Sequence, residues 1–208
     1  AAAPDGTLYV ADTWNHRIQH LDRDGTVLGT WGAHGIVEGM QDAPFSLYGP
    51  RDIALDADSQ LYVTDTGNKR VLVFSPAGDF VTTFGGGGGE PGQFSEPVGI
   101  SIAPDGTIWV ADTWNRRVQG FTADLQPLTS FNVEAWLQTS ITSKPYIAAS
   151  DEWIWISDPD TSRLLEFARD GAIQRVWGVP GSELSRLNRP YGLLLADDSL
   201  YIADSGNQ

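Results

Sequence analysis

The stretch that decides the fold is Ile108-Trp-Val-Ala-Asp112, because the chain repeats this phrase four more times. The other copies are Leu8-Tyr-Val-Ala-Asp12, Leu61-Tyr-Val-Thr-Asp65, Ile154-Trp-Ile-Ser-Asp158 and Leu200-Tyr-Ile-Ala-Asp204. Their closing aspartates are spaced 53, 47, 46 and 46 residues apart. A nearly fixed period of this length is typical of solenoids and propellers, in which one supersecondary unit recurs along the chain.

Each period holds four short alternating runs, which we name strands A to D. Strand A opens at Pro50, Pro97, Pro145 or Pro190, and proline suits the first position of a strand because no ladder donor is lost there. The repeated phrase is strand B, strand C begins at an arginine, and strand D follows a turn such as Pro76-Ala-Gly-Asp. No helical pattern is long enough for a βαβ crossover. The sequence therefore predicts an all-β fold, a β-propeller of four-stranded antiparallel blades.

These strands place the blades along the chain. We expect whole blades at about 50–84, 97–131 and 145–177, with partial blades over 1–31 and 190–208, all in one domain. The first blade lacks strand A, the last stops in its B to C turn, and the only methionine is Met40. We therefore expect about four and a half blades of a propeller truncated at both ends, with six blades when complete. Unpaired strand edges in such a fragment favour edge-to-edge self-association.

The turns that follow strand B carry a family resemblance. Ala11-Asp12-Thr-Trp-Asn15-His-Arg17-Ile, Thr64-Asp65-Thr-Gly-Asn68-Lys-Arg70-Val and Ala111-Asp112-Thr-Trp-Asn115-Arg-Arg117-Val resemble the NHL repeat, named for its Asn-His-Leu signature. Blade four departs from it with Asp158-Pro-Asp-Thr-Ser-Arg163, which lacks the asparagine. Gly49-Pro-Arg-Asp-Ile and the segment 85–94 are also similar to propellers appended to bacterial membrane glycosyltransferases of the mannosyltransferase type. That similarity implies a bacterial, extracytoplasmic domain of a larger membrane protein; nothing else in the sequence assigns a location.

An aspartate and an arginine lie five residues apart in four of the turns. The pairs are Asp12 and Arg17, Asp65 and Arg70, Asp112 and Arg117, and Asp158 and Arg163. The aspartate ends strand B and the arginine begins strand C, so the two can pair across the hairpin. We interpret the pairs as framework that fixes the turn, because repeats reuse their framework residues. The alternative is a ring of charges for a ligand, which mutual neutralisation weakens.

Trp14 and Trp114 are the best candidates for ligand contact. They stand at a turn position where blades two and five carry Gly67 and Gly206, so the turn does not need tryptophan for its geometry. Packing against a neighbouring loop and exposed stacking surface for a sugar or peptide are both open interpretations.

The same end of the blades receives the D to A connections, at about 32–49, 85–96, 132–144 and 178–189, which are longer than ordinary hairpin turns. Loops on a rigid scaffold concentrate function, so we expect binding at this end. His16, Lys69, Arg116 and Tyr191 are the further binding candidates there, although each alone also fits a solvated rim.

Composition limits the partners. The formal charge of −14, from 13 basic and 27 acidic residues, repels a polyphosphate, so we expect no nucleic acid partner. No apolar run approaches the length of a membrane helix, so we expect no membrane insertion of this segment. Cysteine is absent, which removes disulfides and thiolate metal sites.

The sequence contains little that resembles a known catalytic or cofactor-binding motif. The glycine run 85–89 lacks the Gly-Lys-Ser/Thr of a phosphate-binding loop and predicts a flexible connection. His16, His20 and His34 all fall in the first blade, whereas a channel metal site draws ligands from several blades, so we expect no metal or other cofactor. No Gly-x-Ser-x-Gly motif is present, and we identify no catalytic residue.

The sequence therefore favours a non-catalytic interaction module that binds a protein, peptide or glycan at the end bearing the B to C turns and the D to A connections. The alternative is a propeller lyase or metal-dependent hydrolase whose channel site is completed by sequence outside this segment. RNA binding, which some animal NHL domains perform with a basic face, is disfavoured by the charge and by the aspartate beside most signature arginines.

Overall fold

The structure is a computed structural model that describes residues 1–37, 43–136, 144–197 and 199–207. The chain divides into two compact units, Ala1–Ile100 and Ser101–Gln208, and each is described by itself. Both consist of β-sheets with short 3₁₀ turns, as the repeat predicts. Among the described residues, no helix is both long and apolar enough to cross a lipid bilayer.

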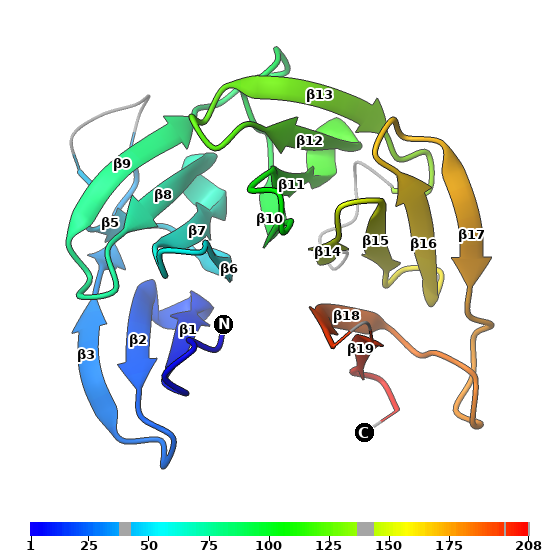
Figure 1. The fold of residues 1–208 in the computed structure, drawn as a ribbon, viewed down its shortest axis with the longest axis horizontal. Coiled ribbons are helices and arrows are strands. Elements are labelled where there is room, and N and C mark those ends of the chain that lie inside the picture. The colour runs from blue at the N-terminus through cyan, green and yellow to red at the C-terminus, as the bar shows by residue number, and fades with distance from the viewer. Residues whose placement is uncertain (38–42, 137–143, 198, 208) are drawn as a thin grey trace. The chain divides into compact units, whose positions relative to one another are not determined.

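The first unit holds two blades (Figure 1). Its first sheet has three strands in chain order, and its second has four. The strands of the two sheets are β1 (Leu8–Asp12), β2 (Arg17–Leu21) and β3 (Val27–Trp31), then β6 (Pro50–Leu55), β7 (Leu61–Asp65), β8 (Arg70–Phe74) and β9 (Phe80–Gly85). Between them, β4 (Ala33–His34) and β5 (Ser46–Leu47) form a small parallel pair.

The second unit holds the remaining blades, and the boundary between the units falls within β10. Its sheets contain β10 (Pro97–Ile102), β11 (Ile108–Asp112), β12 (Arg117–Phe121) and β13 (Pro127–Asn132); β14 (Ile147–Ala149), β15 (Trp153–Asp158), β16 (Arg163–Ala168) and β17 (Ile173–Trp177); and β18 (Pro190–Ala196) with β19 (Ser199–Asp204). Strand A is β6, β10, β14 or β18 in blades two to five. The proline expected at its start is found in three of them; in blade four, β14 begins two residues after Pro145.

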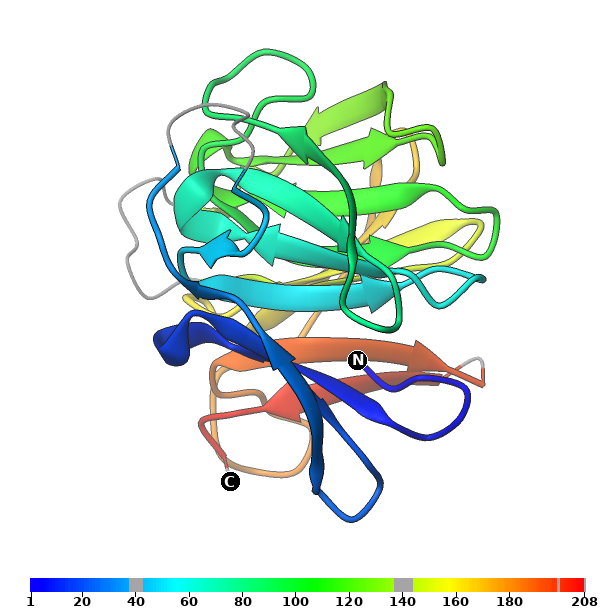
Figure 2. The same cartoon turned by 90° about the vertical axis from the view of Figure 1, so that its left-hand side faces the viewer.

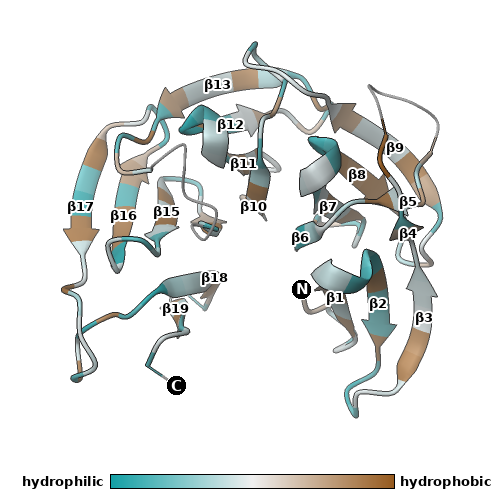
Figure 3. Ribbon diagram, turned by 180° about the vertical axis from the view of Figure 1, so that it is seen from behind, coloured by the Kyte–Doolittle hydropathy of each residue, from teal (hydrophilic) through white to brown (hydrophobic). Residues whose placement is uncertain are grey.

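Burial differs sharply between inner and outer strands. Every residue of β7 and β8 is buried, which explains why these runs are almost continuously apolar rather than alternating. Of the outer strands, β13 and β17 expose most of their residues and β9 exposes its first two, and Figure 3 shows hydrophilic and hydrophobic residues mixed along β17. Each unit therefore has its own core. Tyr9, Leu72 and Phe74 belong to the first core, and Trp109 and Phe167 to the second.

The described parts of the D to A connections contain hydrogen bonds, and residues 38–42 and 137–143 of two predicted connections lie outside the described residues. In the segment 85–96, which the glycine run opens, Phe94 N–H donates to Gly86 O at 2.8 Å and Gly88 N–H donates to Phe94 O at 3.0 Å. A glycine with positive φ ends strand D in blade two, at Gly85, and directly follows it in blades one and four, at Gly32 and Gly178. A Cβ at these positions would meet Leu47, Phe94 and Leu187 respectively. Glycine therefore makes room for one apolar side chain that closes each loop onto its blade.

Candidate functional site

The B to C turns share one backbone design. Asp12, Asp65 and Asp112 each precede a three-residue 3₁₀ turn, namely η1 (Thr13–Asn15), η2 (Thr66–Asn68) and η3 (Thr113–Asn115). The next residue adopts the left-handed conformation at His16 (φ 55°), Lys69 (φ 58°) and Arg116 (φ 54°). Three of the predicted binding residues are thus structural equivalents. In unit 1, η1 and η2 lie at the same end of their sheets (Figure 2).

The D to A connections meet these turns within each unit. Asn68 donates to Gly35 O at 3.0 Å and to Ser46 O at 3.1 Å in unit 1. In unit 2, the Asn207 side chain donates to Gly181 O at 3.0 Å. In each unit a B to C turn therefore contacts a D to A connection.

All four aspartates hold the arginine of the same turn. The nitrogen to oxygen distances are 2.7 Å for Arg17 and Asp12, 2.9 Å for Arg70 and Asp65, 3.0 Å for Arg117 and Asp112, and 2.8 Å for Arg163 and Asp158. Each pair consists of directly opposed residues of strands B and C. The arrangement neutralises the carboxylates and fixes the hairpin, which favours the framework interpretation.

Burial changes the character of these pairs from blade to blade. Asp65 and Arg70 are almost completely buried, whereas the Arg17 side chain is 39% exposed. Burial raises the pKa of the Asp65 carboxyl above its ordinary value, although the Tyr48 N–H, Asn68 and Arg70 all donate to it. At the more exposed turn, the Arg17 side chain holds the pKa of Asp12 below its usual range. The same sequence motif thus gives a buried ion pair in blade two and a partly exposed ion pair in blade one.

Trp14 is the most exposed tryptophan of the predicted site. It lies on η1 with 81% of its surface exposed, and the Arg51 guanidinium lies 5.4 Å from its ring centroid. Trp114, its equivalent on η3, is 42% exposed. Trp14 belongs to unit 1 and Trp114 to unit 2, so each contributes to its own unit's surface.

Gly67 shows why the tryptophan position changes between blades. A Cβ on Gly67 would clash with the ring and carbonyl of Tyr48, and Gly67 N–H donates to that carbonyl at 2.8 Å. Gly206 makes the same contact with Asn188. Glycine is required where the D to A connection packs onto the turn. In blade one the equivalent position is Trp14, and its side chain is exposed to solvent.

An aromatic cluster that the sequence did not predict lies beside this turn. The rings of His16 and His34 are 4.5 Å apart, and Tyr48 lies 5.8 Å from His16 and 5.4 Å from His34. His16 Nδ1 accepts a hydrogen bond from Gly49 N–H at 3.0 Å, so the neutral ring carries its proton on Nε2 and offers a donor there. Histidine and tyrosine near the two ends of the 32–49 connection were the available sequence signal.

The other predicted residues make different contacts. Lys69 is exposed and lies beside the glycine loop at Gly87. Arg116 pairs with Glu134 at 3.1 Å, and Tyr191 is half-buried on β18. His20 stacks on Tyr9 at 4.3 Å and bonds to Thr7, away from His16. Among the described residues, no group of three or more His, Cys, Asp or Glu side chains is arranged to hold a metal ion.

Comparison with known proteins supports the repeat and the fold. The NHL repeat family matches residues 1–21, 47–74 and 94–121. Peptidylglycine alpha-amidating monooxygenase of Rattus norvegicus is 32% identical over 109 residues, which is 48% of this chain and 11% of that protein. Virginiamycin B lyase from Staphylococcus aureus aligns over 98% of this chain and 61% of its own, with a TM-score of 0.67 and 19% identity.

The WD40 domain of Neurospora crassa Pan2 also aligns, over 83% of this chain and 46% of its own, with a TM-score of 0.56 and 12% identity. At these identities the solved structures share the fold alone. The chain spans about three fifths of the lyase chains and one ninth of the monooxygenase. On the repeat match, the four-stranded sheets and these alignments, the chain contains NHL repeats and has a β-propeller fold.

Proposed function

We propose that this chain is a non-catalytic interaction module that binds a protein, peptide or glycan through the end of its blades that carries the B to C turns and the D to A connections. The observation that carries the proposal is Trp14, an 81% exposed indole on a 3₁₀ turn. The turn holds the same backbone with glycine at Gly67, so folding does not require the indole. Exposed aromatic rings with a polar group are enriched at binding surfaces.

The cluster beside Trp14 supports the same role. His16, His34 and Tyr48 place three rings within 6 Å of one another on connections of unit 1. Ring faces can stack on sugars or peptide side chains, while His16 Nε2 and the tyrosine hydroxyl can donate hydrogen bonds. An apolar surface with a few placed polar groups is what ligand recognition needs.

The charges favour partners other than nucleic acid. Four turn arginines are already held by aspartates, so they are not free to contact phosphates. The formal charge of −14 adds long-range repulsion of any polyanion. A neutral glycan or a neutral or basic peptide fits this surface better than RNA does.

The test is a binding screen followed by titration. An immobilised glycan array and a displayed peptide library are screened with the chain, and the tightest ligand is titrated against Trp14→Gly and Trp114→Gly. Both variants copy the native residue of an equivalent turn, so the fold is retained. We expect Trp14→Gly to weaken binding at least tenfold, which is about 1.4 kcal/mol.

A matched control lies on the outer strand of the same blade. Leu28 on β3 is 55% exposed, and Leu28→Ser should leave the affinity unchanged. Wild-type affinity in Trp14→Gly, or no ligand from either screen, would contradict the proposal.

The alternative is an enzyme, a lyase or metal-dependent hydrolase with its site in the channel and completed by residues outside this chain. Its support is the shared fold of the virginiamycin B lyases. This alternative predicts that a longer protein containing the chain holds stoichiometric metal and loses stability on chelation. The interaction module predicts neither effect.

We further propose that the chain is an extracytoplasmic domain of a larger bacterial membrane protein. The support is the similarity of the 49–53 and 85–94 segments to propellers appended to glycosyltransferases. Protease shaving of intact cells that express the longer protein tests this placement. Protection of the propeller from external protease would contradict it.

A further inference from the structure

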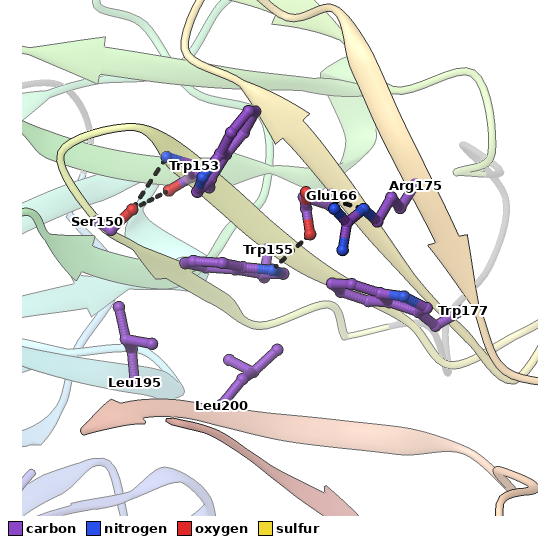
Figure 4. A pocket seen from close by; sticks show the side chains of 8 residues that line it. All are labelled: Ser150, Trp153, Trp155, Glu166, Arg175, Trp177, Leu195 and Leu200. Atoms are coloured by element: carbon purple, nitrogen blue, oxygen red, sulfur yellow. Dashed lines mark hydrogen bonds and ion pairs between the residues drawn. The ribbon is translucent and has the colours of Figure 1, made fainter. Parts of the chain in front are cut away.

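A cavity of about 450 Å³ in unit 2 is lined by a buried carboxylate whose two oxygens both have partners (Figure 4). Trp155 Nε1–H donates to Glu166 Oε2 at 3.1 Å, and Arg175 Nε lies 3.9 Å from Glu166 Oε1. Both partners lie directly opposite Glu166 on the neighbouring strands of its sheet. A carboxylate held in this way cannot turn onto a neighbouring backbone atom. Carboxylates without such partners can.

Aspartate followed by glycine is the dipeptide in which a side-chain carboxyl reacts most readily with its own backbone, because glycine has no side chain to block the approach. The chain contains four such dipeptides, all of them in turns of the described residues. They are Asp5-Gly6, Asp24-Gly25, Asp105-Gly106 and Asp170-Gly171. Because the dipeptide is the same in each, the hydrogen bonds of the carboxylate decide which of them is reactive.

Three of the four carboxylates are held by the backbone. In each, the N–H two residues further on donates to the carboxylate Oδ1 at 2.9 Å. The pairs are Thr7 with Asp5, Thr107 with Asp105, and Ala172 with Asp170. This Asx turn fixes the direction of the carboxyl group, so its carbon is not free to turn onto the nitrogen of the glycine.

Asp24 differs because Asp22 takes the equivalent hydrogen bond. Asp22 Oδ1 accepts from Asp24 N–H at 2.9 Å and from Thr26 N–H at 2.7 Å. No hydrogen bond or ion pair holds the Asp24 carboxylate among the described residues. All of residues 23–28 are exposed, in the turn between β2 and β3 and the start of β3. Asp24 is therefore an exposed carboxylate that is free to rotate.

The C to D turn of blade four is a native comparison. Its sequence Ala168-Arg-Asp-Gly171 aligns with Asp22-Arg-Asp-Gly25 of blade one, and the two glycines have φ values of 88° and 83°. Where blade one has Asp22, blade four has alanine, and there Asp170 accepts the Ala172 N–H. One side chain, that of Asp22, thus distinguishes the free carboxylate from the held one.

The surroundings of the two glycines increase the difference. A Cβ on Gly171 would meet the Phe131 ring, whereas a Cβ on Gly25 would meet nothing within 4 Å. Gly25 N–H donates to Asp22 O at 3.1 Å, and Gly171 N–H donates to Ala168 O at 2.9 Å. Because no side chain packs on Gly25, its turn can open locally without disturbing the core.

We propose that Asp24-Gly25 is a modification site, at which the chain isomerises to isoaspartate and then accepts a methyl group from an isoaspartyl methyltransferase. In the first step the Gly25 nitrogen bonds to Asp24 Cγ. The carboxyl hydroxyl leaves as water with the amide proton, which closes a five-membered imide. Water then opens the ring. Cleavage between Cγ and nitrogen restores aspartate, whereas cleavage at the backbone carbonyl carbon leaves the chain linked through Cβ and Cγ, with a free α-carboxylate.

The new carboxylate is the methyl acceptor. One of its oxygens attacks the methyl group of a sulfonium donor, the thioether leaves, and a methyl ester forms. The exposure of residues 23–28 gives the enzyme access to it. The isomer also lengthens the backbone of a tight turn by one carbon. Asp22 N–H donates to Thr26 O at 2.9 Å across this turn, so the isomer weakens the closure of the hairpin between β2 and β3.

The test is a peptide map of the folded chain after prolonged incubation at mildly acidic pH. A protease that cleaves before aspartate but not before isoaspartate leaves the bond between residues 23 and 24 uncut where the isomer has formed. We expect about tenfold or more isomer at Asp24 than at each of the other three aspartates. Isoaspartyl methyltransferase with a labelled sulfonium donor should label the peptide that contains residue 24. In urea the four sites should react at similar rates, because the hydrogen bonds that separate them are lost.

Two variants test the cause. Asp22→Ala gives blade one the turn sequence of blade four and releases the Thr26 N–H for Asp24, so isomerisation there should slow severalfold. Asp24→Glu keeps the charge but requires a six-membered imide, which forms far more slowly, so the methyl label should be lost. The proposal is overturned if the folded chain forms no isomer at Asp24, if the four sites react alike in the folded chain, if Asp22→Ala does not slow the reaction, or if Asp24→Glu retains the label.

Discussion

Equivalent residues of this repeat differ in burial from blade to blade although the sequence motif is the same. Arg70 and Asp65 form a buried pair, whereas Arg17 and Asp12 form a partly exposed one. Asp52 adds a second kind of buried charge. Its carboxylate accepts from Ile53 N–H and Ile100 N–H, each at 2.9 Å, without a cationic side chain among its described hydrogen-bond partners. These differences in burial make residue-level predictions that the motif alone could not.

Removing the arginine of each pair should separate the two cases. Arg70→Met leaves a buried carboxylate unpaired, and we expect it to lower the free energy of unfolding by about 3–5 kcal/mol. Arg17→Met leaves a carboxylate that water can reach, and we expect a loss of about 1 kcal/mol or less. Urea unfolding of both variants measures the difference. Equal losses would show that burial does not set the strength of these pairs.

Asp52 should make stability fall with rising pH in a defined window. Burial raises its pKa from 3.8 to about 6. Between about pH 4 and 6 the native chain holds a proton that the unfolded chain has lost, so the free energy of unfolding decreases as the pH rises through this window. The two-unit shift corresponds to about 3 kcal/mol.

The measurement for Asp52 is urea unfolding at pH 4 and pH 7 in the wild type and in Asp52→Asn. The change between the two pH values should differ by on the order of 3 kcal/mol, because the variant has no proton to lose there. The amide also alters the hydrogen bonds to Ile53 and Ile100, so the readout is the pH dependence and not the absolute stability. Parallel pH dependences would refute this role for Asp52.

At the scale of elements, the loops between blades are the feature that local sequence patterns described least well. The antiparallel order of the strands and the B to C hairpins follow from the repeated apolar runs and turn residues, and the structure has both, although β14 begins two residues after Pro145. The contacts of the connections span long sequence separations, such as Asn68 with Gly35 and Gly67 with Tyr48. No local pattern encodes such contacts, so the sequence could name His16 as a binding candidate but not its contacts with His34 and Tyr48.

The apolar residue that closes each connection should matter in proportion to its burial. Phe94 is completely buried and packs against Phe84, with ring centroids 6.2 Å apart, so Phe94→Ala should reduce the free energy of unfolding by about 3–5 kcal/mol. Leu187 holds the corresponding place after Gly178 but is only partly buried, and Leu187→Ala should have a smaller effect of about 1–2 kcal/mol. Chemical denaturation compares them. A larger loss for Leu187→Ala would contradict this account of the loops.

At the scale of the whole molecule, the repeated phrase predicts the architecture. The proposed function depends on positions at which the copies of the repeat differ. The all-β propeller fold could be read from five copies of one phrase, because each copy predicts the same strands and the same hairpin. The proposed binding surface lies where copies differ, at the exposed Trp14 turn.

The net charge belongs to this scale as well. A charge of −14 on 208 residues gives the molecule a negative field, and the framework pairs leave few cations to gather into a basic face. The surface chemistry at the B to C turns is instead aromatic, with hydrogen-bond donors on His16 and Tyr48. This combination is the reason that the account proposes a protein, peptide or glycan as the partner.

The measurement that tests the interaction role most directly is the ratio of dissociation constants between Trp14→Gly and the wild type for the tightest ligand of the glycan and peptide screens. Isothermal titration with Leu28→Ser as the control separates a local loss of contact from a general effect on the blade. The account predicts a ratio of about 10 or more for Trp14→Gly and a ratio near 1 for Leu28→Ser. A ratio near 1 for Trp14→Gly, with the ligand still bound, would contradict it.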